Sequence, residues 1–294
     1  MNTGEKQVIT LFQKGFNYSQ DGPGNRLVIH LQGCNMRCPW CSNPEGMPMR
    51  PPLVQRAEQL SDWVCPHGAI SGGQLNRGRC ETCSTRECVT RNRNKELVCM
   101  AEMLTVDELY EECMAGRAMF FDGGGVTLTG GEASMQLEAV EELLSRLKSA
   151  GINTAMETNA THQGLERLFP HLDLLIADYK HYNNQKHEAV TGADNHAVLK
   201  NIKKAAQLIP VWVRVPLIGG FNTGAADIPG FVSQLKTLPQ ENVSVEFLPY
   251  HEYGKDKWKQ CGMEYRMKHG FVLPDRVKAF EEACRQAGIN IVRT

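Results

Sequence analysis

The chain has almost no net charge, because 32 Lys and Arg residues stand against 33 Asp and Glu residues among 294. Such a balance gives no general attraction to nucleic acid or to anionic membranes. Long apolar runs are also missing, and the first 14 residues lack the basic-then-apolar order of a signal peptide. We therefore expect a cytoplasmic protein with neither a nucleic-acid partner nor a membrane partner.

Cysteine, in contrast, is abundant, with 11 residues. Disulfides are rare in a reducing compartment, so clustered thiols there indicate metal ligands or catalytic groups. Eight of the cysteines form two groups, one of three residues and one of five. The other three are expected to be buried as small hydrophobic residues. The first group is Cys34, Cys38 and Cys41; the second is Cys65, Cys80, Cys83, Cys88 and Cys99; the isolated residues are Cys113, Cys261 and Cys284.

Short apolar runs rich in β-branched residues alternate with amphipathic stretches, which predicts parallel strands joined by helices. One helix is expected to start after Thr105, which can form a capping box with Glu108, and the last helix at Pro274. Six repeats predict an α/β fold, an incomplete (β/α)6 barrel of the TIM type. The expected strands are 27–31, 126–128, 152–156, 172–177, 211–215 and 243–247.

Residues 51–100 break this alternation and hold five of the eleven cysteines. We expect them to form an inserted, ferredoxin-like minidomain that is stabilised by metal rather than by an apolar core. The barrel would then consist of residues 1–50 and 101–294. The second half of the insert is basic, with Arg77, Arg79, Arg86, Arg91, Arg93 and Lys95.

The first cysteine group directly follows the expected strand 27–31 and places three thiols within eight residues. Three thiolates can bind a [4Fe–4S] cluster and leave one iron without a protein ligand. That iron can bind the amino and carboxylate groups of a methionine moiety, and its electron can break an adjacent sulfonium bond. One alternative is structural zinc, with His30 as the fourth ligand, and another is three unrelated thiols. Zinc sites usually pair cysteines with two residues between them, whereas three residues separate Cys34 from Cys38.

The spacing CxxxCx(aromatic)C resembles the signature of radical S-adenosylmethionine (SAM) enzymes, in which Trp40 would lie near the adenine. The segment 21–26, Asp-Gly-Pro-Gly-Asn-Arg, and the segment 247–251, Phe-Leu-Pro-Tyr-His, resemble the branch that activates glycyl radical enzymes. Pyruvate formate-lyase activating enzyme is the best-known member of that branch. The resemblance covers nearly the whole chain.

This resemblance implies roles for polar residues beyond the strand ends, where such barrels place their chemistry. Glu132 would bind the SAM amino group and Arg214 the SAM carboxylate. Glu157 and Ala160 depart from the family's Asp-Thr-Asn-Gly, which argues against a monovalent cation site. The SAM-binding residues that the resemblance implies are Trp40, Asn43, Gly130, Gly131, Glu132, Asp178, Lys180, Arg214 and His251.

The second group resembles half of a bacterial ferredoxin, because Cys65 is followed by proline. With Cys80, Cys83 and Cys88 it would complete one closed [4Fe–4S] cluster. Cys99 would be a remnant of a lost site or a substitute ligand, and four-cysteine zinc is the alternative. The basic stretch could dock an acidic electron donor such as flavodoxin or ferredoxin, or could be a solvated loop.

The resemblance thus implies an anaerobic radical SAM oxidoreductase that cleaves SAM to methionine and a 5′-deoxyadenosyl radical. The radical would take a hydrogen atom from a backbone glycine of a partner glycyl radical enzyme, and Asp21 would contact the partner's glycine loop. One alternative is a radical SAM enzyme that acts on a small molecule. Another is an electron carrier without catalytic activity, which would bind no SAM.

Overall fold

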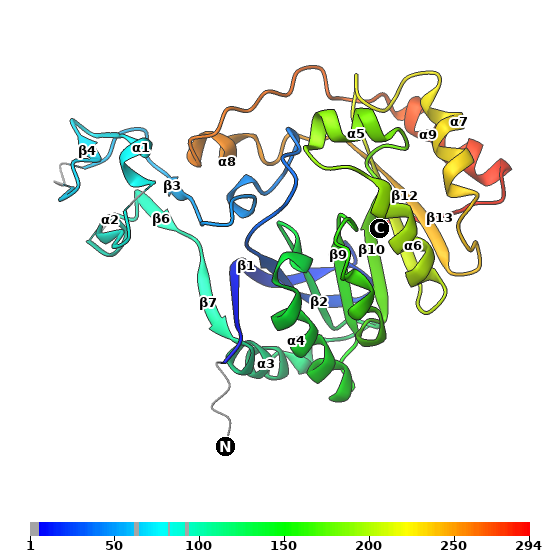
Figure 1. Cartoon of the computed structure of the whole chain (residues 1–294), viewed down its shortest axis with the longest axis horizontal. Helices are drawn as coiled ribbons and strands as arrows, with labels where there is room; N and C mark the ends of the chain where they lie inside the picture. Colours follow the sequence, from blue (N-terminus) through cyan, green and yellow to red (C-terminus); the bar gives the residue numbers. More distant parts are fainter. Residues whose placement is uncertain (1–5, 62–64, 82, 92–93) are drawn as a thin grey trace.

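The computed structural model describes residues 6–61, 65–81, 83–91 and 94–294, so Arg93 of the basic stretch lies outside the described residues. Its centre is one nine-stranded sheet (Figure 1). The strand order is β13 (Asn290–Ile291), β12 (Val243–Pro249), β11 (Val211–Leu217), β10 (Leu174–Asp178), β9 (Thr154–Thr158), β8 (Val126–Gly130), β2 (Asn25–Leu31), β1 (Val8–Tyr18) and β7 (Glu102–Thr105).

In the order of the sheet, β2, β8, β9, β10, β11, β12 and β13 run parallel, as the alternating pattern predicts. Each of the six expected strands lies within, or overlaps, one of them. The sequence did not predict β1, β7 and β13. The first two add an antiparallel edge beside β2, and β13 extends the opposite edge. The two outer strands, β7 and β13, are not paired with each other in the described part of the chain, so the barrel is open.

The two faces of the sheet differ in polarity because successive side chains of a strand point to opposite faces. In β2, Leu27, Ile29 and Leu31 belong to the main apolar core, whereas His30 faces an interior cavity. This core lies between the sheet and an outer layer of helices. Those helices are α3 (Val106–Ala115), α4 (Leu137–Ser149), α6 (His196–Ala206), α7 (Asp227–Leu235) and α9 (Pro274–Gln286); α5 (Asn184–Thr191) and α8 (Lys255–Gln260) lie near the ends of the parallel strands.

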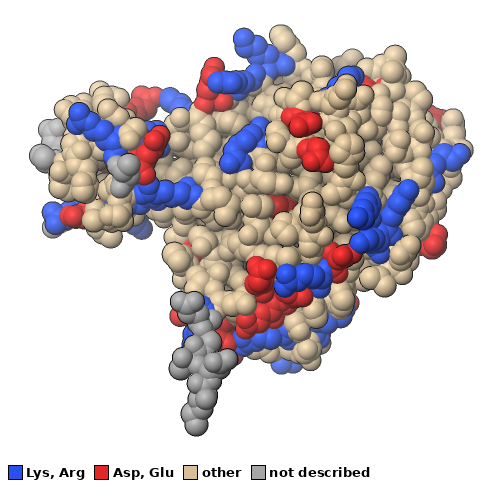
Figure 2. All heavy atoms as spheres, in the orientation of Figure 1, with Lys and Arg blue, Asp and Glu red and all other residues tan. Residues whose placement is uncertain are grey.

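Several local predictions are confirmed. Thr105 and Glu108 form the capping box of α3, and Pro274 is the first residue of α9. The three isolated cysteines are buried. In the part of the chain that the structure describes, no helix combines the length and apolar character needed to cross a membrane. Basic and acidic side chains are interspersed on the face in Figure 2, as the near-zero net charge suggests.

The cysteine-rich segment stands apart from the barrel and is joined to it at one side (Figure 1). Its first and last strands pair antiparallel, so the segment leaves and returns through one two-stranded stem. A small apolar cluster that includes Leu53, Ile70 and Leu97 lies inside, next to the cysteines. The segment therefore has some apolar core of its own. Its elements are β3 (Leu53–Gln55), β4 (Ile70–Ser71), β5 (Gln74–Leu75), α1 (Arg77–Cys80), α2 (Glu87–Arg91) and β6 (Leu97–Cys99).

Arg26, the last residue of the Asp-Gly-Pro-Gly-Asn-Arg segment, is fully buried inside the barrel. Its guanidinium donates to Thr127 Oγ1 (2.6 Å), to Asn153 Oδ1 (2.9 Å) and to the carbonyl of Val126 (2.9 Å). Thr127 in turn donates to the carbonyl of Asp21 (2.7 Å). Burial lowers the pKa of Arg26 to about 10. Arg26 thus joins the turn at Asp21 to β8 and to the loop before β9.

We predict that Arg26→Lys lowers the free energy of unfolding by about 2–4 kcal/mol, because an ammonium group cannot reproduce the planar fork and leaves buried acceptors unpaired. Urea titration under reducing conditions measures this change. The control is Arg266→Lys, where an exposed pair with Glu264 should be worth less than about 0.5 kcal/mol. Equal effects of the two substitutions would contradict the structural role of Arg26.

Candidate active site

The first cysteine group lies in a loop between β2 and a short 3₁₀ turn, Pro44–Gly46. Backbone bonds fix both ends of the loop: Gly33 N–H donates to the carbonyl of Gly46 (2.8 Å) and Cys34 N–H to that of Met47 (2.9 Å). As predicted from their spacing, all three cysteines line one cavity, which has about 1030 Å³ of free space. His30, the alternative fourth zinc ligand, does not line this cavity.

Burial raises the pKa of Cys38 and of Cys41 to about 12. Lys180 opposes this rise in both thiols, and its own pKa is raised: burial disfavours its charge, but Asp178 and Cys38 favour it more. The ammonium group therefore stays charged beside the cysteines. A cation at this position suits thiolates that bind a metal cluster.

Most of the predicted SAM-binding residues line the same cavity. They come from loops that follow β2, β8, β10 and β12, so distant parts of the sequence meet at the carboxyl ends of parallel strands. Of the predicted residues, Trp40, Asn43, Gly130, Gly131, Asp178, Lys180 and His251 line the cavity beside the three cysteines.

Gly130 and Gly131 are required for the packing of the backbone, in addition to any contact with a ligand. A Cβ atom on Gly130 would lie 2.2 Å from the backbone nitrogen of Leu31, and one on Gly131 would lie 2.3 Å from the carbonyl oxygen of Gly33. Gly130 also has a φ of +122°. Only glycine permits this approach, so these residues allow the end of β8 to pack directly against the start of the cysteine loop.

Glu132 and Arg214 do not line this cavity, and both already have internal partners. The Glu132 carboxylate accepts from Thr158 Oγ1 (2.7 Å) and from the backbone N–H of Asn159 (2.7 Å). Arg214 Nε donates to Glu246 (2.9 Å), and its Nη1 donates to Glu157 (2.5 Å). Their contacts with SAM stay predictions.

Asp21 and Arg214 line a second space, an open groove of about 1520 Å³ that adjoins the first cavity. Glu157 and His251 line both spaces. Burial and the nearby Glu157 raise the pKa of Asp21. Glu157 behaves oppositely: burial disfavours its charge, but Arg214 outweighs this effect and lowers its pKa. The site therefore has two compartments, one at the cysteines and one at Asp21.

The sequence analysis assigned no role to several lining residues. Thr129 donates to Glu157 (2.8 Å), and Asn159 lies beside the cysteine loop, where it donates to Asn35 (2.8 Å). Their position after a strand is the one signal that could have identified them. The other cavity-lining residues without a prediction are Met36, Ser42, Thr158, Pro216, Ile218, Leu248, Pro249 and Tyr250.

Helix α8 holds the cysteine loop from the outside. Lys257 Nζ bonds to Asn43 Oδ1 (2.9 Å) and to the buried carboxylate of Glu45 (2.7 Å). Trp258 Nε1 donates to the carbonyl of Cys41 (2.9 Å). The C-terminal motif thus contributes His251 to the cavity and α8 to the loop's support.

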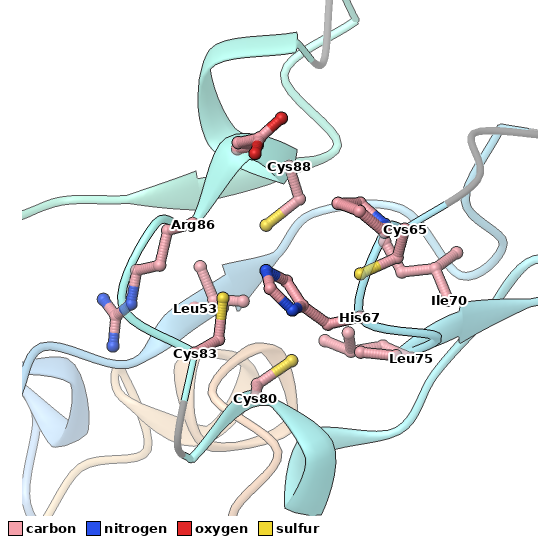
Figure 3. Close-up of a pocket in the computed structure, with 12 residues that line it drawn as sticks. Leu53, Cys65, His67, Ile70, Leu75, Cys80, Cys83, Arg86 and Cys88 are labelled. Atoms are coloured by element: carbon pink, nitrogen blue, oxygen red, sulfur yellow. The ribbon is translucent and has the colours of Figure 1, made fainter.

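The second group lies in the insert, where Cys65, Cys80, Cys83 and Cys88 line one small pocket. Figure 3 shows the four sulfur atoms around one space, with the ring of His67 among them. Cys99 does not line it; its sulfur accepts from Arg86 Nη1 (3.1 Å). Across the described ranges, no three His, Cys, Asp or Glu side chains converge tightly enough to hold a single metal ion.

Comparisons with known proteins agree with this geometry. The family model for the radical SAM superfamily matches residues 28–227. The choline trimethylamine-lyase activating enzyme of Oleidesulfovibrio alaskensis is 36% identical over 95% of this chain and 94% of its own length. The 4-hydroxyphenylacetate decarboxylase activating enzyme of Clostridioides difficile is 32% identical over 83% of each chain. A radical SAM methyltransferase from Sphaerobacter thermophilus shares the fold, with a TM-score of 0.58, 13% identity and coverage of 99% of this chain and 74% of its own.

The chain therefore belongs to the radical SAM superfamily, whose members use a [4Fe–4S] cluster and SAM. Within that superfamily it belongs to the activating enzymes of glycyl radical enzymes. Three cysteines that line one cavity, with no fourth cysteine among its lining residues, fit a cluster with one open iron.

We predict that Lys257→Met destabilises the protein by about 2 kcal/mol and speeds loss of the cluster, because it leaves the buried carboxylate of Glu45 without its cation. Iron release to a chelator under anaerobic conditions measures the second effect. Lys259→Met is the matched control two residues away, since its pair with Glu58 is almost fully exposed. The same release rate in both variants would show that α8 does not support the loop.

Proposed function

We propose that the two compartments divide the reaction, with SAM and the cluster in the cysteine cavity and the partner's glycine in the groove. The observation that supports this division is that the two spaces adjoin and share Glu157 and His251 along their boundary. When bound, the cluster and SAM supply a 5′-deoxyadenosyl radical, which takes a hydrogen atom from a glycine Cα of the partner. A cavity beside an open groove suits a large substrate better than a small molecule.

Side chains of the cysteine cavity position SAM in this proposal. Trp40 lies 5.0 Å from the ring of Phe221, centroid to centroid, and this pair forms an apolar wall for the adenine. Lys180 and Asp178 form an ion pair beside the cysteines and orient polar groups of SAM. Asn43 and His251 contact SAM at the side that faces the groove. Glu132 and Arg214 each exchange one internal hydrogen bond for a bond to SAM.

Asp21 contacts the glycine loop of the partner in the groove. Arg26 and Thr127 hold the turn that carries it, and Asn17 Nδ2 donates to its carboxylate (2.5 Å). An acceptor at this position can bind a backbone N–H of an extended loop. Choline trimethylamine-lyase and 4-hydroxyphenylacetate decarboxylase, which are named in the relatives, are the first candidate partners.

The test uses reconstituted protein, reduced anaerobically and mixed with SAM and each candidate partner. We expect 5′-deoxyadenosine by chromatography and a glycyl radical in the partner by EPR. Cys38→Ala should lower both by a factor of at least about 10³, because the cluster loses a ligand. Cleavage of SAM without a glycyl radical in either partner would count against the groove as a protein site. No cleavage by cluster-loaded protein would count against the catalytic role itself.

The insert holds a second [4Fe–4S] cluster in this proposal, bound by Cys65, Cys80, Cys83 and Cys88. It receives electrons from an acidic donor such as flavodoxin. Four of the nearby arginines already have partners. Arg77 bonds to the carbonyls of Leu53 and Gln260 and Arg79 to that of Gly68, while Arg86 bonds to the sulfur of Cys99 and Arg91 pairs with Glu87. Docking therefore rests on the remaining basic side chains.

We predict that Cys80→Ser combined with Cys88→Ser lowers the iron content from about eight to about four per chain, since each cluster holds four irons. Flavodoxin-driven cleavage of SAM should slow more than dithionite-driven cleavage, because dithionite reaches the catalytic cluster directly. Iron analysis and the two rates check this. An unchanged iron content together with bound zinc would replace the second cluster by a zinc site.

A further inference from the structure

Four large hydrophobic side chains lie exposed at the edge of the groove and beside it. They belong to the end of β1 and to the turn after α3, and each has between 46% and 53% of its surface exposed. Single exposed hydrophobic residues are ordinary, but a contiguous patch indicates a contact surface. The patch consists of Phe16, Tyr18, Met119 and Phe121.

The patch is contiguous and already ordered. The rings of Tyr18 and Phe121 lie 6.1 Å apart, and those of Phe16 and Phe120 also 6.1 Å apart. Asn25 donates through its side chain to the carbonyl of Met119 (2.8 Å) and through its backbone to that of Phe121 (3.1 Å). A surface fixed in this way loses little conformational entropy when it binds.

The patch and the groove adjoin along β1. Phe16 lines the groove together with Gln13, Gly15 and Asn17, whereas Tyr18 does not line it and donates to Asp122 (3.1 Å). The pairing of β1 with β7 ends at Leu11, so the rest of β1 forms the rim of the groove. A protein segment that enters the groove must cross this rim.

The area that a stable protein complex buries also argues for a contact at this patch. A stable complex buries about 800 Å² on each partner, more than one loop around a glycine supplies. Contact must therefore extend beyond the groove, and this patch is apolar surface that adjoins the groove at Phe16. It is flanked by Arg117 and Asp122, one charge of each sign, which suits a protein surface better than a polyanion.

We propose that Phe16, Tyr18, Met119 and Phe121 form the docking surface for the body of the partner glycyl radical enzyme, with Phe16 at the edge of the groove that takes its glycine loop and the other three beyond it. The proposal rests on the proposed function and adds a second contact to it. The groove recognises an extended loop, whereas the patch recognises the folded protein that carries it. The two contacts should then be separable by experiment.

The test compares the full-length partner with a synthetic peptide that spans its glycine. The partner is whichever of choline trimethylamine-lyase and 4-hydroxyphenylacetate decarboxylase binds the wild-type chain. The variant is Met119→Gln combined with Phe121→Gln, both outside the groove and the cysteine cavity. The matched control is Leu208→Gln, an exposed residue that precedes β11, a strand separated from β1, β2 and β8 by β9 and β10 in the sheet.

We expect the double variant to raise the KM for the full-length partner about ten-fold or more, with kcat nearly unchanged, because hot-spot aromatic contacts are lost. SAM cleavage driven by the peptide should not change, and the control should behave as wild type. Equal loss with peptide and partner, or no loss with either, would overturn the docking surface. A change in the oligomeric state of the variant alone would assign the patch to self-association and overturn it too.

Binding is also measured without chemistry, by sedimentation of the cluster-loaded chain with the partner. Wild-type binding that the double variant loses supports the docking surface even if no glycyl radical forms. Such binding without a glycyl radical would overturn the proposed function but would still support the docking surface. Binding that persists in the variant would overturn the patch and leave the proposed function intact.

Discussion

The rest of the structure depends on one constraint: three thiols must be held in place by a loop that has almost no secondary structure of its own. The loop is fixed where Gly33 and Cys34 bond to the turn after it, and where Gly130 and Gly131 let β8 touch its backbone. Helix α8 supplies the third support, through Trp258. Each support comes from a different part of the chain, so the cluster site exists only when the barrel is assembled.

The interior of this barrel is polar where a closed barrel would be filled by apolar side chains. Arg26, Arg214, Glu157 and Glu246 lie inside and satisfy one another or backbone carbonyls. Buried charges are tolerated when they are paired and hydrogen-bonded. The apolar stabilisation comes instead from the outer layer between sheet and helices. This division leaves room inside for a charged ligand without loss of the core.

The sequence predicted the parallel strands because their runs are apolar and bounded by turns. It missed β1 because Gln13, Lys14 and Gly15 interrupt the pattern at a half-exposed edge, and it missed β13 because two residues give no periodicity. Motifs identified the three cysteines and seven of the nine expected SAM-binding residues of the cysteine cavity. They could not identify the partners of Arg214, or the bond from Lys257 to Asn43 across more than 200 residues, because such contacts arise only from the tertiary fold.

The two-stranded stem of the insert has a consequence for how the chain can vary. Because β3 and β6 lie side by side, the whole segment begins and ends at nearly one point of the barrel. The insert roughly doubles the number of residues in the connection between β2 and β8, and this added length costs about 0.6 kcal/mol in loop-closure entropy. Exchange, shortening or loss of this segment therefore perturbs the folding of the barrel little. The bond from Arg77 to the carbonyl of Gln260 nevertheless fixes the insert against α8, the helix that supports the cysteine loop, so the length of the segment is less constrained than its contact with that helix.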